Sequence, residues 1–358
     1  MDHDRWMKRA LELALQGEGH VHPNPMVGCV IVKGNKLIAG GCHRAFGQAH
    51  AEVEALRQAG SKARGATLYI NLEPCVHWGK TPPCVEAIDR AGVKEVVIPF
   101  KDPNPLVKGK GIRYLRRNGI TVRTGILENE ARELNRAFIW WMQKKRPYVT
   151  LKIAASLDGK IAAASGESRW ITGTAARREG HRMRAQADAV AVGIETVLKD
   201  NPRLTSHGFG RNPCRVIFDS RLRIPASARA LDSSAQTIIF TSSRSSASQR
   251  RRLEKPGTRV IILRSDSSGR LSLHEALKRL GEMDITHLMV EGGGRLLGSF
   301  LREKLANEVV WFAAPILIGH EGRSAVGELN VKKLSSAWHL KNIEIKMLGQ
   351  DLCIKGKF

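Results

Sequence analysis

The sequence predicts two α/β domains, and three observations support this fold class. A chain of 358 residues with 42% hydrophobic content is longer than one usual domain and can fill two cores. Apolar runs typical of buried strands alternate with helical stretches in the first part of the chain. The same alternation starts again after Pro147, which follows a basic run and disfavours further helix. We therefore place the domains at residues 1–145 and 146–358.

The first domain is expected to begin with an amphipathic helix, in which Trp6, Ala10, Leu13 and Ala14 share one side. Acids and bases alternate here from residue 2 onward, which is unlike a signal peptide. We expect strands at 26–32, 66–72 and 95–100. Helices are expected at 50–60, 84–92 and 128–141.

The second domain repeats the pattern with β-branched apolar runs and one long helix. Strands are expected at 148–156, 187–193, 286–293 and 308–317, and a helix at 174–187. The stretch 242–257 is polar, rich in serine and arginine, and low in complexity. We predict an exposed loop or a poorly ordered helix edge there.

The charge balance is strongly basic, with 58 Lys and Arg against 34 Asp and Glu, a net charge of +24. The excess is spread over both domains rather than gathered in a stripe, so it fits a surface bias as well as an anionic partner. We expect a phosphorylated small molecule rather than nucleic acid. Six cysteines do not suggest a disulfide framework, and no apolar run approaches the roughly 20 residues of a membrane span. We therefore expect a cytoplasmic protein with no membrane partner.

A zinc site is indicated by His50, Cys75 and Cys84, each placed at or near the start of a helical segment that follows a strand. Catalytic zinc takes three such ligands and keeps its fourth position for water. Glu52, two residues after the histidine, can take the proton of that water and pass it to the ring nitrogen and the departing amine. This pattern is the signature of nucleobase deaminases. The alternative is a helix-capping histidine beside two buried thiols.

The spacing departs from that signature, because eight residues rather than two separate Cys75 from Cys84. The longer loop leaves four side chains near the mouth of the pocket: His77, Trp78, Lys80 and Thr81. His77 is a conceivable competing ligand, although a polar contact is the commoner role for such a histidine. Upstream, the prolines that flank Asn24 fix a loop that can present its amide to a heterocycle. An ordinary proline-rich turn is the alternative.

Three glycines at 292–294 join a strand to a probable helix, a place where bare amides suit phosphate. The dinucleotide fingerprint fails here, because its third glycine would fall at Leu297. Taken alone, the glycines indicate a tight turn as readily as a phosphate cradle.

At this point the sequence resembles a known family. The segments HPNPMVGCVIV, HAEVEAL and LEPCVHWGKTPPC resemble the deaminase domain of the bifunctional riboflavin-biosynthesis deaminase/reductase family. The segments LKIAASLDGKIA, SGESRWITG, RAQADAVAVGIETVLKDNPRLT and VEGGGRLLGSFL resemble its reductase domain. The resemblance implies a cytidine-deaminase-like α/β/α layered domain followed by a dihydrofolate-reductase-like α/β domain. It also implies one Zn²⁺ in the first domain and NADPH in the second.

The resemblance further implies two reactions. The first removes the 2-amino group of 2,5-diamino-6-(5-phosphoribosylamino)pyrimidin-4-one, with His50, Cys75 and Cys84 on zinc and Glu52 as the proton shuttle. The second reduces the ribosyl group to ribityl, giving 5-amino-6-(5-phosphoribitylamino)uracil. The cofactor residues implied are Ala154, Trp170, Thr196, Asp200, Gly293, Gly294, Arg295, Leu296, Leu297, Gly298 and Ser299. The substrate residues implied are Ser168, Arg184, Leu204, His207 and Glu291, with Asn24 in the first domain.

One departure from the family stands at His207, where the resemblance leads us to expect an arginine that contacts the substrate phosphate. The charge at this position becomes pH dependent, and Arg203 or Arg211 is a candidate to compensate. Lys152 and Asp158 are further pocket candidates, although a strand lysine and a turn aspartate are more often structural.

Other functions are compatible with parts of the pattern. The zinc signature and the basic charge also fit an RNA-editing deaminase with a basic RNA-binding C-terminal domain, which would bind RNA in a salt-sensitive way and would not bind NADPH. A chain in which one of the two sites has decayed is a third reading. A homodimer is expected from the family resemblance alone.

Overall fold

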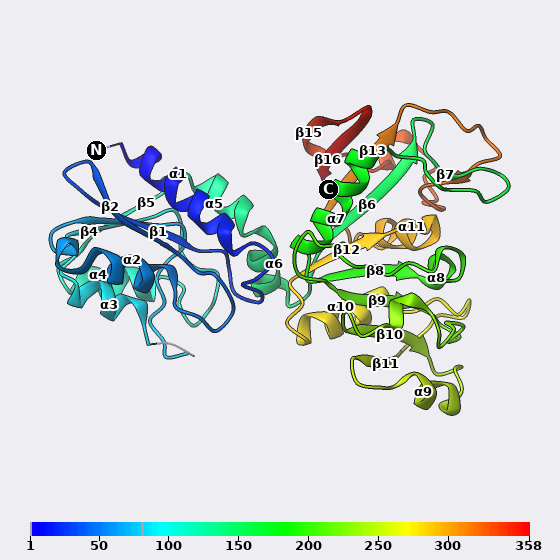
Figure 1. Cartoon of the computed structure of the whole chain (residues 1–358), viewed down its shortest axis with the longest axis horizontal. Helices are drawn as coiled ribbons and strands as arrows, with labels where there is room; N and C mark the ends of the chain where they lie inside the picture. Colours follow the sequence, from blue (N-terminus) through cyan, green and yellow to red (C-terminus); the bar gives the residue numbers. More distant parts are fainter. Residues whose placement is uncertain (1, 80–81) are drawn as a thin grey trace. The chain divides into compact units, whose positions relative to one another are not determined.

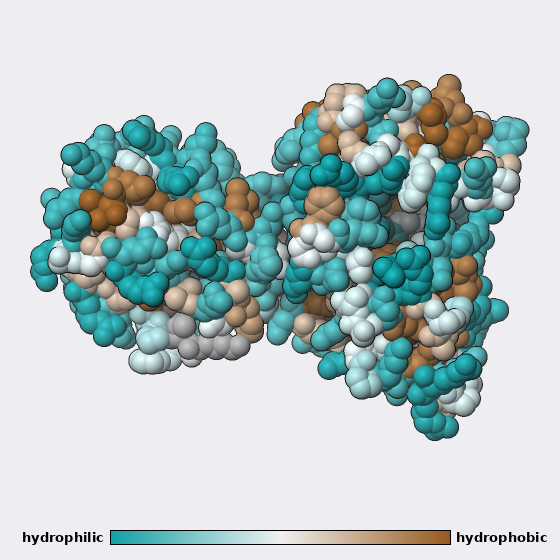
Figure 2. Space-filling model, viewed as in Figure 1, coloured by the Kyte–Doolittle hydropathy of each residue, from teal (hydrophilic) through white to brown (hydrophobic). Residues whose placement is uncertain are grey.

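The computed structural model describes residues 2–79 and 82–358. The chain separates into two compact units, the first ending at Lys145 and the second spanning Arg146–Phe358 (Figure 1). Hydrophilic side chains cover most of the face of each unit that Figure 2 shows. Within the described ranges, every helix is too short or too polar to cross a membrane.

The first unit is built on a five-stranded sheet in the order β2-β1-β3-β4-β5. Strand β1 pairs antiparallel with β2 and β3, and the β3-β4 and β4-β5 pairs are parallel. The carboxyl ends of β3 and β4 therefore meet at one edge of the sheet. The strands are β1 (Gly28–Lys33), β2 (Lys36–Cys42), β3 (Thr67–Ile70), β4 (Glu95–Ile98) and β5 (Thr121–Thr124).

Helices cover both faces of this sheet, giving three layers (Figure 1). Val30 and Val32 pack against Trp6 of α1 on one face, whereas Ile31 packs against Ala55 of α2 on the other. This alternation follows from the two-residue period of a strand. The helices are α1 (His3–Ala14), α2 (Ala51–Ala59), α3 (Cys84–Arg90), α4 (Lys110–Arg117), α5 (Glu128–Leu134) and α6 (Arg136–Lys144), with 3-10 turns at Leu15–Gly17 and Gly60–Ala63.

The single helix expected at 128–141 is wrong, because Asn135 divides it into α5 and α6. Asn135 is 2% exposed, and its side chain forms two hydrogen bonds with the backbone of Met26. Its Nδ2 donates to the Met26 carbonyl at 2.9 Å, and its Oδ1 accepts from the Met26 N–H at 2.8 Å. This long-range contact, which no local pattern encodes, competes with helix continuation at that residue.

The second unit contains a nine-stranded sheet in the order β11-β10-β9-β8-β12-β6-β13-β16-β15. Neighbouring strands are parallel from β11 to β13, and the hairpin β15-β16 adds two antiparallel strands at one edge. The strands are β6 (Tyr148–Ser156), β8 (Ala189–Gly193), β9 (Cys214–Phe218), β10 (Thr237–Ser242), β11 (Thr258–Leu263), β12 (His287–Glu291), β13 (Glu308–Ala314), β15 (Lys341–Leu348) and β16 (Asp351–Lys357). A separate small sheet pairs β7 (Lys160–Ala162) with β14 (Arg323–Ser324).

Two hydrophobic cores lie on opposite faces of the large sheet. Leu277 of α10 and Phe300 of α11 join one core, while Val197 of α8 and Leu253 of α9 join the other. The helices are α7 (Thr174–Gln186), α8 (Ile194–Asp200), α9 (Ala247–Leu253), α10 (Leu273–Glu282) and α11 (Gly294–Arg302), with 3-10 turns at Arg229–Leu231 and Leu334–Ser336.

Helix α9 lies inside the polar stretch 242–257, so the prediction of a loop or poorly ordered helix edge is wrong for Ala247–Leu253. Ser246 and Gln249 form a reciprocal capping box at its start, and Leu253 is buried at its end. Local capping and one apolar anchor are enough to order this short helix on the sheet.

Candidate active sites

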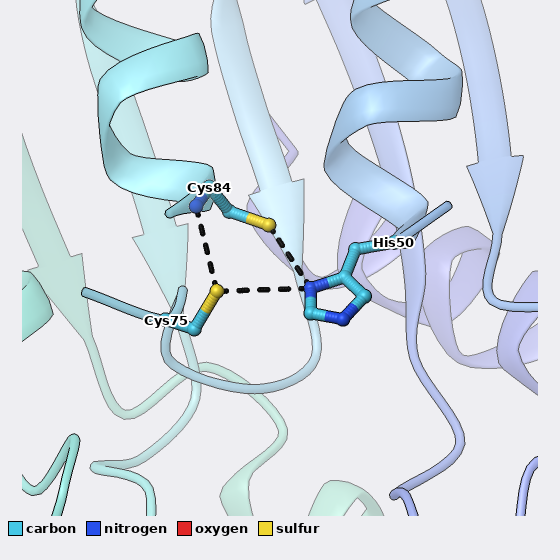
Figure 3. A group of neighbouring side chains, drawn as sticks. All are labelled: His50, Cys75 and Cys84. Carbon is cyan, nitrogen blue, oxygen red and sulfur yellow. Dashed lines mark hydrogen bonds between the residues drawn. The ribbon is translucent and has the colours of Figure 1, made fainter. Parts of the chain in front are cut away.

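His50, Cys75 and Cys84 come together at one edge of the first sheet (Figure 3). His50 is the residue before α2, Cys84 is the first residue of α3, and Cys75 lies in the loop after β3. Nδ1 of His50 lies 3.1 Å from Sγ of Cys84 and 3.7 Å from Sγ of Cys75. The backbone N–H of Cys84 donates to Sγ of Cys75 at 3.4 Å. All three ligand atoms lie within 4.8 Å of one another.

These separations fit a tetrahedral zinc ion. With Zn–S near 2.3 Å and Zn–N near 2.0 Å, nitrogen and sulfur ligands should lie about 3.6 Å apart. The two observed N···S distances, 3.1 and 3.7 Å, bracket that value. Over the described part of the chain, these are the residues whose ligand atoms gather closely enough to hold a metal ion.

The described residues of the loop between Cys75 and Cys84 lie outside the metal-ligand group. His77 lines the cavity beside the three ligands but does not belong to the metal-ligand group, and its buried Nδ1 has no hydrogen-bond partner among residues 2–79 and 82–358. Trp78 is 72% exposed. Lys80 and Thr81, expected near the pocket mouth, lie outside the described residues.

The electrostatics of the cluster favour one ionised thiol. The side-chain hydrogen bond between the Cys84 and Cys75 thiols, aided by His50, lowers the pKa of Cys75 to about 4. That same hydrogen bond and burial raise the pKa of Cys84. Glu52, the second residue of α2, is 3% exposed, and burial raises the pKa of its carboxyl above the ordinary value. A carboxyl group shifted in this direction is better suited to exchanging protons near neutral pH.

A cavity of about 280 Å³ opens beside these residues, and Asn24 and Glu52 line it. Nε2 of His43 lies 3.1 Å from Nδ2 of Asn24, and Nδ1 of His43 lies 3.1 Å from the carbonyl oxygen of Ala49. A carbonyl only accepts, so the proton sits on Nδ1 and Nε2 accepts from the amide. Burial lowers the pKa of His43, in keeping with a neutral ring. The arrangement leaves Oδ1 of Asn24 as the acceptor of that side chain.

Several residues of this cavity were missed from the sequence. They come from the loop after β4, from α6 and from the loop before α2, and include His43, Phe46, Asp102, Asn104, Phe138 and Trp141. One signal was present: Pro103-Asn104-Pro105 repeats the pattern of Pro23-Asn24-Pro25, and both asparagines line the cavity. The α6 residues gave no such signal, because an apolar helix face is typical of any core.

A second cavity, of about 1030 Å³, lies in the second unit around the carboxyl ends of its parallel strands. Most of the residues expected at the cofactor and substrate line it: Ala154, Ser168, Arg184, Thr196, Asp200, Leu204, Glu291, Gly293, Gly294, Arg295, Leu296, Leu297 and Ser299. Trp170, His207 and Gly298 are not among the lining residues. Of the two further candidates, Lys152 lines the cavity, whereas Asp158 accepts backbone N–H bonds from Ile318 and Gly319.

Arg184 of α7 and Glu291 at the end of β12 form a two-point ion pair in this cavity. Nε and Nη2 of Arg184 donate to the two carboxylate oxygens, each at 2.7 Å. Burial alone would raise the pKa of Glu291, but the charge and hydrogen bonds of Arg184, together with the charges of Lys152 and His181, outweigh burial and lower that pKa to about 2. Burial lowers the pKa of nearby Lys152 despite the attraction of Glu291.

The glycine segment and its surroundings suit a polyanionic ligand. Gly292 and Gly293 have φ values of +66° and +76°, and Gly294 begins α11. At Gly294 an added Cβ would lie 2.6 Å from the carbonyl oxygen of Ser324, so a side chain would not fit. Basic and hydroxyl side chains that the sequence reading missed also line the cavity: Lys199, Ser220, Arg223, Ser268, Arg270 and Arg323. Helix N-termini and arginines are ordinary partners of phosphate.

His207 lies near Arg184 but in an unexpected pairing. The His207 ring stacks on the ring of His181 of α7, with centroids 4.1 Å apart. The ring of Phe209 also stacks on His181, with centroids 6.4 Å apart. Burial and the charges of Arg184 and Arg203 lower the pKa of His207. Arg211 is paired with Asp188 at 3.2 Å.

Comparison with known proteins gives consistent matches over nearly the whole chain. Residues 1–99 match the cytidine and deoxycytidylate deaminase zinc-binding region, and residues 147–354 match the RibD C-terminal domain. The riboflavin biosynthesis protein RibD of Aquifex aeolicus is 45% identical, over 98% of this chain and 96% of its own length.

Solved structures agree with the sequence matches. Acinetobacter baumannii RibD (form 1) is 39% identical with a TM-score of 0.91, and the match covers 99% of this chain and 98% of that chain. A Thermotoga maritima protein, a diaminohydroxyphosphoribosylaminopyrimidine deaminase/5-amino-6-(5-phosphoribosylamino)uracil reductase, is 39% identical with a TM-score of 0.88 and the same coverage. The first unit is thus cytidine-deaminase-like, the second is a dihydrofolate-reductase-like RibD reductase domain, and the chain belongs to the RibD family of riboflavin-biosynthesis proteins.

Proposed function

We propose that this chain catalyses two consecutive steps of riboflavin biosynthesis, a deamination in residues 1–145 and a reduction in residues 146–358. The observation that carries the proposal is the coexistence of a three-ligand zinc geometry beside a buried glutamate with a large basic cavity in a RibD reductase fold. The RNA-editing alternative is not supported, since the matches over nearly the whole length are to RibD proteins.

In the deaminase, His50, Cys75 and Cys84 would hold Zn²⁺, which when bound supplies a Lewis acid that makes water nucleophilic at neutral pH. Glu52 takes a proton from the attacking water and delivers protons to the ring nitrogen and to the leaving ammonia. Burial of its carboxyl supports this role. Asn24 supplies a fixed acceptor to the pyrimidine, because His43 engages its amide N–H.

The substrate of this step is 2,5-diamino-6-(5-phosphoribosylamino)pyrimidin-4-one, the class that the Thermotoga maritima relative is described as deaminating. Its pyrimidine is planar and its ribosyl phosphate is anionic. Phe46, Phe138 and Trp141 give the cavity aromatic walls that can pack on a flat ring and exclude water.

In the reductase, NADPH would supply the hydride. The cavity of about 1030 Å³ is large enough for a dinucleotide and substrate together, and its glycine turn and arginines suit the phosphates. The cofactor residues proposed are Ala154, Trp170, Thr196, Asp200 and the segment 293–299. The substrate residues proposed are Ser168, Arg184, Leu204, His207 and Glu291, of which Arg184 and Glu291 are fixed by their mutual hydrogen bonds.

The decisive experiment incubates the pure chain with the diaminopyrimidine, first without and then with NADPH, and follows the products by mass. Two successive changes are expected: loss of an amino group as ammonia, followed by gain of two hydrogens. Glu52→Gln should retain zinc and lose about 10² to 10⁴-fold of the deamination rate, with the reduction of authentic deaminated intermediate unaffected. Unchanged ammonia release in Glu52→Gln would remove the shuttle assignment, and absence of NADPH oxidation would remove the second step.

We also propose that the chain forms a homodimer through the free edge of β15, the last strand of the large sheet. Ile343, Ile345 and Met347 project from one face of this strand and are 56%, 65% and 59% exposed. Antiparallel pairing of two copies about Ile345 would place Glu344 of each opposite Lys346 of the other, a favourable charge match. Light scattering should give twice the chain mass, and Ile345→Lys should give the monomer mass.

A further inference from the structure

Glu73 is a buried carboxylate with no role in the chemistry above. It follows β3, lies two residues before Cys75, and is 3% exposed. Its partners are three backbone N–H groups of one segment. Oε2 accepts from Asp102 at 2.9 Å and from Gly109 at 2.8 Å, and Oε1 accepts from Ile112 at 3.1 Å.

That segment, residues 101–112, follows β4 and includes the start of α4, and it forms one wall of the smaller cavity, to which it contributes Asp102 and Asn104. It is ordered internally by two turns of its own. Oδ1 of Asp102 accepts from the N–H of Asn104 at 2.7 Å, and Oδ1 of Asn104 accepts from the N–H of Leu106 at 3.0 Å. These local bonds shape the loop, but they do not set its distance from the metal ligands.

The segment also packs directly against the residues that precede Cys75. An added Cβ at Gly111 would lie 2.4 Å from the carbonyl oxygen of Pro74 and 3.1 Å from Oε1 of Glu73. Close approach of the two backbones therefore requires glycine at this position. This contact fixes the segment 101–112 against Pro74, the residue next to Cys75.

We infer that Glu73 is a positioning residue for the deaminase: it ties the loop 101–112 to the ligand-bearing segment and so sets the width of the substrate cavity. The inference rests on the proposed deaminase reaction. A carboxylate is required because its two oxygens accept all three N–H groups, whereas an amide has one oxygen and would turn an NH₂ group toward at least one of them. A displaced wall should weaken substrate binding more than it slows the chemical step at Glu52.

The test compares wild type, Glu73→Gln and Gly111→Ala in the full chain loaded with zinc. Gly111→Ala displaces the same segment, chiefly through the Pro74 contact, and keeps the carboxylate of Glu73, so it serves if Glu73→Gln fails to fold. We expect the KM for the diaminopyrimidine to rise about ten-fold in each variant, with kcat changed by less than about three-fold. Zinc content should stay at one per chain, and amide hydrogen exchange should accelerate in residues 102–112.

Glu12→Gln, which changes an exposed carboxylate of α1 paired with Arg9, is the matched control and should leave KM unchanged. Reduction of the deaminated intermediate in the second unit should be unchanged in every variant. An unaltered KM in both loop variants, or a fall in kcat that tracks lost zinc, would overturn the inference. Failure of wild type to release ammonia would instead count against the proposed reaction, and calorimetric binding of the diaminopyrimidine would then decide the positioning role.

Discussion

Arg184 and Glu291 meet in a two-point ion pair, with both N···O distances at 2.7 Å, inside the larger cavity. The side chains are 14% and 11% exposed, so the pair is largely withdrawn from water. Arg184 also donates to the carbonyl oxygen of Thr205 at 3.1 Å, which joins α7 to the loop that follows α8. The pair therefore holds the guanidinium in place in the cavity wall and ties three elements together.

The first prediction concerns the two halves of this pair. Glu291→Met should destabilise the second unit more than Arg184→Met, because Glu291 also attracts the buried ammonium of Lys152. Breaking a buried ion pair costs about 3–5 kcal/mol, and two uncompensated cations are worse than one anion that still faces a lysine. Urea unfolding followed by circular dichroism measures the difference. Equal losses of unfolding free energy in the two variants would show that Glu291 does not stabilise the Lys152 ammonium.

The second prediction is a pH dependence of stability from His181. Burial, together with the charges of Arg184 and His207, lowers its pKa to about 4 from an ordinary value of 6.5. Between these values the unfolded chain binds a proton that the folded chain does not, so stability is complete above pH 6.5 and falls as pH drops toward 4. Lys152 adds to the repulsion and Glu291 opposes it.

His181→Gln removes this titration and should flatten the fall in stability between pH 6.5 and 4.5, whereas His339→Gln, at an exposed position, should not. Thermal unfolding at half-unit pH steps gives the slopes. The stabilisation that comes from the ionised Glu291 carboxylate is lost at lower pH, as the pH falls from 4.5 toward 2. The pH range of the Glu291 effect therefore differs from that of the His181 effect. A His181→Gln slope equal to that of wild type would show that the imidazole is not held neutral by folding.

The third prediction concerns His207, where an arginine is expected from the family. Burial and the charges of Arg184 and Arg203 lower the pKa of this imidazole below 6.5, so it is neutral at pH 8. His207→Arg should supply a permanent charge and lower the reductase KM at pH 8 by about ten-fold, the effect of one charge-assisted hydrogen bond. A dephosphorylated substrate is the control and should show no such gain. If both substrates respond alike, His207 does not face the phosphate.

The sequence predicted much of this architecture because periodicity is a local property. The strand runs 148–156, 286–293 and 308–317 correspond to β6, β12 and β13, which are buried enough to read as continuous apolar stretches. The hairpin β15-β16 was not predicted. Its strand β15 is an exposed edge whose apolar residues alternate with charges, a pattern that does not mark a core strand.

The same distinction between local patterns and long-range contacts applies to the proposed sites. The metal cluster was predicted because one histidine and two cysteines, each near the start of a helical segment, identify a chemistry before any fold is known. His43, Glu73 and Asp102 were missed because their roles depend on partners that the fold brings from elsewhere in the chain. Likewise, no periodicity shows that Asn135 would leave a helix to hold Met26, 109 residues earlier.

The fourth prediction tests that contact. Asn135→Ala removes both hydrogen bonds to Met26, but Nδ2 of Asn71 still donates to the Met26 carbonyl at 3.0 Å. The Met26 N–H alone is therefore left without its partner, at a cost of about 1–3 kcal/mol in the first unit. Asn118→Ala, where the exposed amide donates to the Tyr114 carbonyl, should cost less than about 0.5 kcal/mol. Urea unfolding compares the two, and the deaminase KM should rise only in Asn135→Ala, because the loop that carries Asn24 is anchored through Met26.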